Sequence, residues 1–323
     1  MSTTTQAARP VDLRALPKAE LHCHLDGILD RAMLRDIRAA DPAFPVNPQV
    51  FDAAYPVESY DQFWQWWQGI NPIEGSLAHF APILACHIER LKTQNVRYAE
   101  IMIASSELPE DIAESLDAVA AFRALADHIG SEQTEVEFMV AFGRGQTPER
   151  VSVLTDKWIA LCRAGLIVGV ALAGQEHIRP AQAFAPTFDR LREAGLGIEI
   201  HAGEWCGPES VRDALDYGRP NRIGHGVSAF QDQALLDAIR ECGIHLEMCP
   251  TSNLRTGSVL SIAAHPIRRA LDLGLSFSIN TDDPGPFENS MLAEYALLAE
   301  HLDFSQQDFE QVYWNSLAAR FQR

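Results

Sequence analysis

The sequence is poor in lysine and contains no long apolar run. Only three of its 323 residues are lysine, and the formal net charge is −18. An acidic surface of this kind repels a phosphate backbone, so we expect no nucleic-acid partner. No segment approaches the roughly 18 apolar residues that a membrane span requires, and the N-terminus lacks a basic region followed by an apolar stretch. We therefore expect no membrane association and a cytoplasmic location.

The six cysteines are scattered and none belongs to a Cys-x-x-Cys pair. In a chain of this length, such spacing indicates reduced thiols of an intracellular protein and not a disulfide framework. The same spacing gives no support to a zinc site built from thiolate pairs.

Short β-branched segments alternate with longer segments of helical period. Within residues 76–94, for example, apolar residues recur at steps of three and four. Proline or a small polar residue opens several of the helical segments, and glycine closes them. The predicted strands span residues 19–23, 96–103, 136–142, 166–172, 197–201, 222–225, 244–249 and 275–280. The predicted helices between them span residues 76–94, 111–130, 148–164, 180–194, 208–217, 231–241 and 266–273.

Eight repeats of strand and helix predict an α/β fold with parallel strands, either open or closed as a (β/α)8 TIM barrel. Two segments fall outside the repeat. Residues 31–75 follow the first strand and are expected to form an inserted helical lid, and residues 300–323 add helical structure at the C-terminus. Residues 1–10 are small and polar, which is typical of a disordered tail. Residues 11–323 are therefore expected to form a single domain.

Polar residues that could bind a metal or take part in catalysis stand at the carboxyl ends of the predicted strands. Barrel enzymes assemble their active sites at that face, so this distribution favours the closed barrel. The residues are His22, His24, His201, Glu204, His225, Asp282 and Asp283.

Several of these residues form a plausible metal site. His22 and His24 are two residues apart, so both imidazoles can point from one strand to one ion. Three histidines, an aspartate and an open coordination position suit a catalytic Zn²⁺ that activates water. Imidazole also suits iron, cobalt or nickel, so one divalent ion, with zinc as the first choice, is the predicted cofactor. For His225, which lies between two glycines, an ordinary structural role is the alternative.

Two other kinds of zinc site are not supported. None of the three lysines, Lys18, Lys92 and Lys157, follows a predicted strand, which argues against a binuclear site with a carboxylated lysine. The signature of the cytidine-type zinc deaminases, a histidine–glutamate pair followed by Pro-Cys-x-x-Cys, is also absent.

Five segments in barrel order carry a family resemblance. Residues 20–27, 201–204, 223–226, 249–253 and 280–284 resemble the adenosine deaminase family of the metal-dependent amidohydrolase superfamily. The segment Leu172–Glu176 is similar to the loop that contacts the base in that family. The resemblance runs from Leu16 to about Tyr295 and thus covers nearly the whole chain.

The resemblance implies a role for each site residue. The implied metal ligands are His22, His24, His201 and Asp282. The implied catalytic residues are Glu204, which would protonate the purine N1, and His225 and Asp283, which would orient and polarise the attacking water. The implied substrate-binding residues are His24, Asp26, Gly174 and Asp283, with the Gly174 N–H on the purine N3 and Asp26 on a ribose hydroxyl.

Adenosine is the expected substrate, because Asp26 stands where related adenine-specific enzymes tend to carry glutamate. The alternative is another aminopurine: adenine, an N6-substituted adenine or a purine with an unusual 9-substituent. Departures from the family pattern at Ile28, Met102 and Ser105, and the aromatic cluster in residues 63–67, leave this alternative open. The expected partner is thus a small purine nucleoside or base, and the chain could act as a monomer or a homo-oligomer. Two alternatives belong to other functional classes. One is a purine-binding scaffold without activity, and the other is a barrel hydrolase that acts on amides or esters.

Overall fold

The computed structural model describes residues 11–46, 57–70 and 77–322 of the chain. Within these residues, eight strands form one sheet in which each strand pairs in parallel with the next along the chain. A parallel bridge between Cys23 and Asp282 then joins the last strand region to the first. The strands are β1 (Lys18–His24), β2 (Val96–Ala104), β3 (Glu135–Gly143), β4 (Gly169–Ala173), β5 (Gly197–Ala202), β6 (Arg222–His225), β7 (His245–Met248) and β8 (Phe277–Ile279). The predicted (β/α)8 barrel is confirmed.

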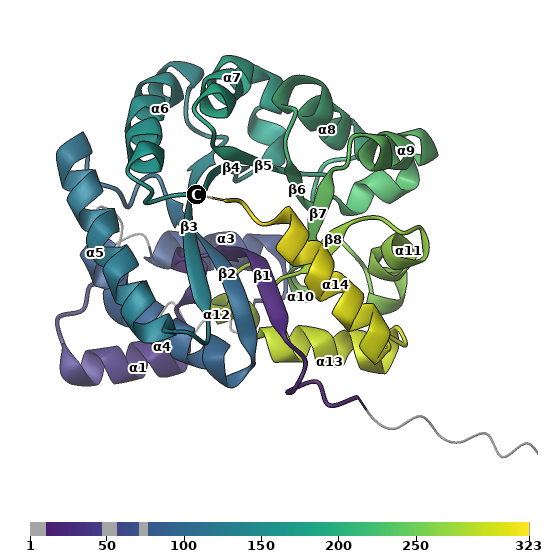
Figure 1. Cartoon of the computed structure of the whole chain (residues 1–323), viewed down its shortest axis with the longest axis horizontal. Coiled ribbons are helices and arrows are strands. Elements are labelled where there is room, and N and C mark those ends of the chain that lie inside the picture. The colour runs from purple at the N-terminus through teal and green to yellow at the C-terminus, as the bar shows by residue number, and fades with distance from the viewer. Residues whose placement is uncertain (1–10, 47–56, 71–76, 323) are drawn as a thin grey trace, which may run out of the picture.

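Helices follow the strands and surround the barrel (Figure 1). Local sequence explains where several begin, because Asp111, Thr147 and Asp232 cap the first turns of their helices through their side chains. The helices that follow β1 to β7 include α4 (Ala81–Thr93), α5 (Ile112–Gly130), α6 (Pro148–Arg163), α7 (Ala185–Glu193), α8 (Pro208–Asp213), α9 (Gln233–Glu241), α10 (Pro250–Arg255) and α11 (Ile267–Asp272). No helix in the described part of the chain is both long and apolar enough to cross a membrane.

The boundaries differ from the predicted ones in a few places. The fourth strand starts at Gly169 and not at Leu166, because Gly165 has a positive φ of 69° and the Leu166 N–H still bonds back to Leu161 at 3.0 Å. The turn after helix α6 therefore occupies residues that the apolar pattern assigned to the strand. The predicted helix over residues 76–94 is also divided, into a 3₁₀ turn (Leu77–Phe80) and α4.

The insertion after β1 contains two described helices, α1 (Arg31–Ala40) and α3 (Tyr60–Ile70). On α3, Phe63 and Trp66 are buried, while Trp64 and Trp67 line a cavity at the carboxyl end of the barrel. The predicted helical lid is confirmed to this extent. The predicted disordered tail (1–10) and residues 47–56 and 71–75 of the insertion lie outside the described residues.

The C-terminal segment closes the opposite end of the barrel. Helices α12 (Pro284–Phe287), α13 (Met291–His301) and α14 (Gln306–Ala319) follow β8, and the segment after α14 runs across the barrel toward β3 and β4 (Figure 1). There the Phe321 ring occupies the space above Gly169 and Gly197, where an added Cβ would lie 2.5 Å or less from it. The Arg222 guanidinium lies 3.5 Å from the centre of the same ring. The two glycines and the phenylalanine thus form one packing unit.

We expect Phe321→Ala to destabilise the fold by about 3–5 kcal/mol, because it removes a buried aromatic ring and leaves a cavity between two glycines that cannot fill it. Urea unfolding followed by circular dichroism measures this change. Trp314→Ala, which removes a ring that is 63% exposed, serves as the control and should change stability by less than about 0.5 kcal/mol. Equal stabilities of the two variants would contradict the role of Phe321.

Candidate metal-dependent active site

The predicted metal ligands converge at the carboxyl ends of three strand regions, β1, β5 and β8. His22 Nε2 lies 3.2 Å from Asp282 Oδ1. His24 Nε2 lies 3.5 Å from the same oxygen and 3.2 Å from His201 Nε2. Ligand atoms of His22, His201, His225 and Asp282 all lie within 4.8 Å of one another. The structure therefore brings together the four predicted ligands and adds His225 to their neighbourhood.

Each of three imidazoles is held through its second ring nitrogen. His22 Nδ1 lies 2.8 Å from Glu247, and His201 Nδ1 lies 3.1 Å from Glu199. The Asn253 side chain lies 3.2 Å from His225 Nδ1. Such contacts fix the orientation of a ring and leave Nε2 directed at the shared centre.

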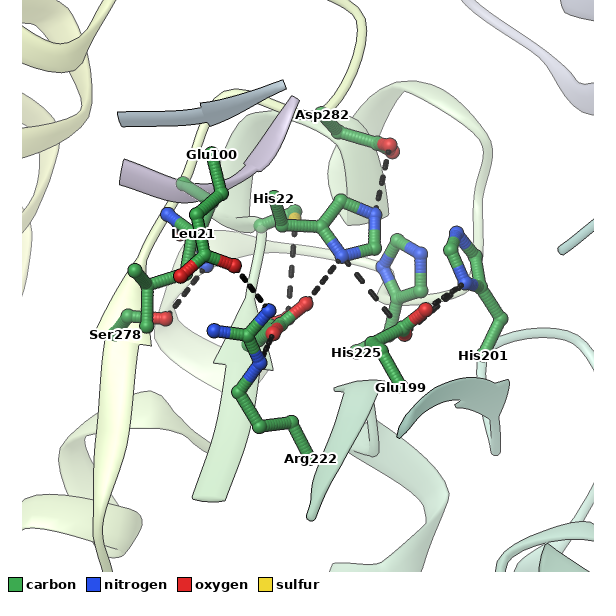
Figure 2. A network of polar contacts seen from close by, with 12 residues as sticks. Leu21, His22, Glu100, Glu199, His201, Arg222, His225, Ser278 and Asp282 are labelled. Atoms are coloured by element: carbon green, nitrogen blue, oxygen red, sulfur yellow. Dashed lines mark hydrogen bonds and ion pairs between the residues drawn. The ribbon is translucent and has the colours of Figure 1, made fainter. Parts of the chain in front are cut away.

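Asp282 has a partner of its own, because the Ser252 hydroxyl donates to its Oδ2 at 2.6 Å. Its other oxygen faces the imidazoles (Figure 2). Asp282 also has a positive φ of 66°, a conformation that costs energy in a non-glycine residue. The backbone is therefore held in an unfavourable conformation at the residue whose carboxylate faces the histidines.

The donor set fits a divalent cation. His22 Nε2 is buried and has no hydrogen-bond partner in the described structure. Burial lowers the pKa of His24 to about 4 and that of His201 to about 3, so both rings are neutral at pH 7, as metal ligands must be. For Asp282, burial opposes ionisation, but the close contact with His22 and the charges of nearby imidazoles outweigh it and lower its pKa well below the usual value.

Two further carboxyl groups lie beside this centre. Glu204 Oε2 is 3.4 Å from His225 Nε2. Burial, followed by the charge of Asp282, raises the pKa of Glu204 well above its usual value, and the same two causes act on Asp283. Gly27 makes room for Asp283, because a Cβ at position 27 would lie 1.9 Å from the carboxylate. Both acids are thus suited to hold a proton at neutral pH.

The centre opens into a cavity of about 380 Å³. Its metal-facing part includes His24, His201, His225 and Asp282, and its walls include Asp26, Gly174, Glu204 and Asp283. Gly174 has a positive φ of 83°, and an added Cβ would lie 3.4 Å from the Arg144 nitrogen. Every residue that the sequence proposed for the site lines this cavity except His22, which lies beneath it, fully buried.

The departures from the family pattern divide into two groups. Ser105, Trp64 and Trp67 line the cavity, whereas Ile28 and Met102 are not among the described residues that do so. Met102 is fully buried and packs with Met139 and Phe321 inside the barrel. The position of Met102 therefore does not support the role in substrate choice that the sequence suggested for it.

Sequence reasoning missed the carboxylates that hold the histidines. Glu199 and Glu247 are fully buried within strands whose other residues are mostly apolar. That pattern is itself a signal, because an unpaired carboxylate is rarely found inside a barrel. Glu247 also pairs with Arg222, which reaches Glu100 on the other side (Figure 2). A buried line of alternating charge thus runs from His22 into the barrel.

Comparison with known proteins assigns this architecture to a family. The family model described as adenosine deaminase matches residues 17–322. The chain belongs to the adenosine deaminase family. As a member of this family, it is a hydrolytic deaminase of the amidohydrolase superfamily, and aminopurines are the substrate class.

Known proteins resemble this chain over almost its full length. An adenine deaminase of Agrobacterium fabrum is 34% identical over 310 residues, which cover 95% of this chain and 94% of the relative. The crystal structure of an adenine deaminase from Arthrobacter aurescens superposes with a TM-score of 0.84 at 25% identity, covering 96% of this chain and 95% of that one. An amidohydrolase from Burkholderia ambifaria, solved with bound Zn, shares the fold at a TM-score of 0.82 and 24% identity, with 96% and 87% coverage.

We expect Glu247→Gln to weaken binding of a divalent metal by about 10–100-fold, because the amide holds His22 less firmly than the carboxylate does. Competition for Zn²⁺ with a chromophoric chelator measures the affinity. Glu241→Gln, on the exposed end of α9, is the matched control and should leave the affinity unchanged. The same affinity in both variants would show that Glu247 does not support the metal centre.

Proposed function

We propose that this protein deaminates adenine, converting the base and one water molecule into hypoxanthine and ammonia. This proposal changes the substrate expected from the sequence, adenosine, to its alternative. The two adenine deaminases cited above support it by name, and the position of Asp26 supports it by geometry. The base, and not the nucleoside, is the substrate that the cavity suits best.

Asp26 carries the argument about the substrate. One of its carboxylate oxygens accepts from the Trp67 indole N–H at 3.0 Å, and the other accepts from the Gly27 N–H at 3.1 Å. Both oxygens therefore have partners before any substrate binds. A ribose hydroxyl would have to share this carboxylate with the Trp67 indole N–H and the Gly27 N–H, whereas a free base makes no such demand.

His22, His24, His201 and Asp282 are proposed to hold one divalent ion, and Zn²⁺ is the first choice. Nitrogen and oxygen donors with an open position suit catalytic zinc. The zinc-bound structure of a protein with the same fold agrees with this choice. A divalent ion in this position lowers the pKa of a coordinated water and so supplies the nucleophile at neutral pH.

Glu204 is proposed as the acid that acts on the ring. Water adds to C6 easily only if the neighbouring ring nitrogen, N1, accepts a proton as the C6–N1 double bond opens. Glu204 is buried and lines the cavity, and burial followed by the charge of Asp282 raises its pKa well above the usual value, which favours the protonated form that the step requires. The proton that the water loses can then pass to the departing amine, which leaves as ammonia.

His225 and Asp283 are proposed to orient the attacking water from two sides. His225 stands between Glu204 and the ligand group, 3.4 Å from the Glu204 carboxylate. Asp283 lies in the cavity next to Asp282 and can donate to the purine N7 when protonated. The backbone N–H of Gly174, across the cavity, is proposed to contact N3, and His24 adds an apolar ring face for the base.

The first test compares substrates. We expect the zinc-loaded protein to release ammonia from adenine with a kcat/KM at least about 100-fold higher than from adenosine, because the nucleoside must share the Asp26 carboxylate with the Trp67 indole N–H. Coupled spectrophotometric detection of ammonia measures both rates. Faster turnover of adenosine than of adenine would contradict the proposal.

A lid variant tests the reason for this preference. Trp67→Phe keeps a ring but removes the donor to Asp26, so the ratio of adenine to adenosine turnover should fall by about 10-fold. Trp64→Phe, which alters the neighbouring stacked ring, is the control and should leave the ratio unchanged. A ratio that changes equally in both variants would assign the preference to the shape of the lid and not to Asp26.

Glu204→Gln distinguishes an enzyme from a purine-binding scaffold. The variant should lose about 10²- to 10⁴-fold in kcat, because glutamine cannot deliver the proton that N1 requires. Isothermal titration with hypoxanthine checks that the cavity still binds a purine. Unchanged turnover would remove Glu204 from the mechanism, and absence of turnover in the parent protein would favour the scaffold.

A further inference from the structure

One polar pair in the cavity has no part in the reaction described so far. Ser105 follows β2 and Gln146 follows β3, and both line the cavity. The Gln146 side-chain amide nitrogen donates to the Ser105 hydroxyl at 3.0 Å. The amide oxygen, Oε1, is buried and has no hydrogen-bond partner in the described structure. A buried acceptor without a donor costs free energy, so its retention in a substrate cavity points to a ligand group that donates to it.

The pair is held firmly in place. Ser105 is only 7% exposed, and its backbone N–H donates to the Ala141 carbonyl at 2.7 Å. The Gln146 N–H donates to Gly143 at 3.0 Å, and its carbonyl accepts from Arg179 at 2.6 Å. These contacts fix the backbone that carries both side chains, and the amide itself is held by its hydrogen bond to the Ser105 hydroxyl. An acceptor held in this way can discriminate between ligands.

The order of the strands around the barrel indicates which edge of the base meets this pair. Water adds to C6 through the face of the ring, so one face is directed to the histidines and the ring edge to the surrounding loops. The edge atoms N1, N3, N9 and N7 follow one another around a purine. With N1 at Glu204 after β5 and N7 at Asp283 after β8, the path through β4, β3, β2 and β1 must accommodate N3 and then N9.

This order gives each edge atom a partner. In that arrangement Gly174, after β4, would be the first residue on the path and would lie next to N3. Gln146 and Ser105, after β3 and β2, come next and would face N9. In adenine N9 carries a hydrogen and is a donor, whereas in adenosine and in every 9-substituted adenine it carries carbon. The unsatisfied acceptor would then face a position where only the free base offers a donor.

We propose that Gln146 Oε1 accepts a hydrogen bond from N9–H of the base, with Ser105 as the residue that positions the amide, and that this contact selects unsubstituted adenine. The inference rests on the proposed deamination of adenine and adds the residue that recognises the imidazole edge. A substituent at N9 leaves the oxygen buried without a donor and brings carbon against it. Sites built to hydrogen-bond an N–H reject analogues that lack it far more strongly than apolar pockets do.

The test compares adenine with 9-methyladenine, the smallest analogue without the donor. In the parent protein we expect adenine to exceed 9-methyladenine in kcat/KM by about 100-fold or more. In Gln146→Ala, kcat/KM for adenine should fall by about 10- to 100-fold, while the value for 9-methyladenine stays within about 3-fold, so the preference largely disappears. Gln146→Met, of similar length and without an acceptor, should behave in the same way and replaces the alanine variant if that variant does not fold.

Two control variants separate recognition from general damage. Gln146→Glu keeps an acceptor oxygen and should retain the preference for adenine. Gln175→Ala removes a glutamine from the same cavity whose amide nitrogen already donates to the Tyr60 hydroxyl. We expect it to change both substrates by the same factor.

The outcomes distinguish this inference from the proposed function. If the parent protein deaminates adenine but the Gln146 variants lose the same factor in kcat/KM on adenine and on 9-methyladenine, the inference is wrong and the proposed function stands. Absence of turnover on adenine in the parent protein would overturn the function. In that case, calorimetric titration of the zinc-loaded protein with adenine and with 9-methyladenine still tests recognition at N9, and equal affinities would refute it.

Discussion

His22 Nδ1 lies 2.8 Å from the Glu247 carboxylate, and this contact joins the active site to the interior of the barrel. Glu247 is fully buried, so its charge must be balanced from within. Arg222 balances it, pairs with Glu100 as well, and stacks on the Phe321 ring at the other end of the barrel. The orientation of one proposed metal ligand is thus linked, through buried charges, to the segment that closes the barrel.

The parts of the fold that could be predicted are those set by local pattern. The strand ends were predicted closely because glycine and apolar periodicity mark them, and the active-site face followed from the reactive residues at the carboxyl ends of the strands. The fourth strand was predicted three residues too early, since Leu166–Val168 are apolar whether they belong to a strand or to the turn after α6. Periodicity alone does not distinguish these two cases.

The site was harder to predict wherever it depends on contacts between distant strands. The proposed metal ligands could be suggested from the sequence, because the histidines stand at strand ends and match the motifs of the family, and the structure brings them together. Two other groups were not predicted from the sequence: the carboxylates Glu199 and Glu247, and the pair Ser105–Gln146. Their contacts depend on which strands are neighbours in the barrel. The engagement of Asp26 by Trp67 belongs to the same class, and it is what changes the expected substrate from nucleoside to base.

The central claim is that one divalent ion, held by His22, His24, His201 and Asp282, makes this protein a deaminase of adenine. Titration of metal-free protein with Zn²⁺, with bound metal and ammonia release from adenine measured on the same samples, tests it most directly. The account predicts that activity rises in proportion to bound zinc and reaches its plateau at one ion per chain. Full activity of the metal-free protein, or a plateau that requires a second ion, would contradict it.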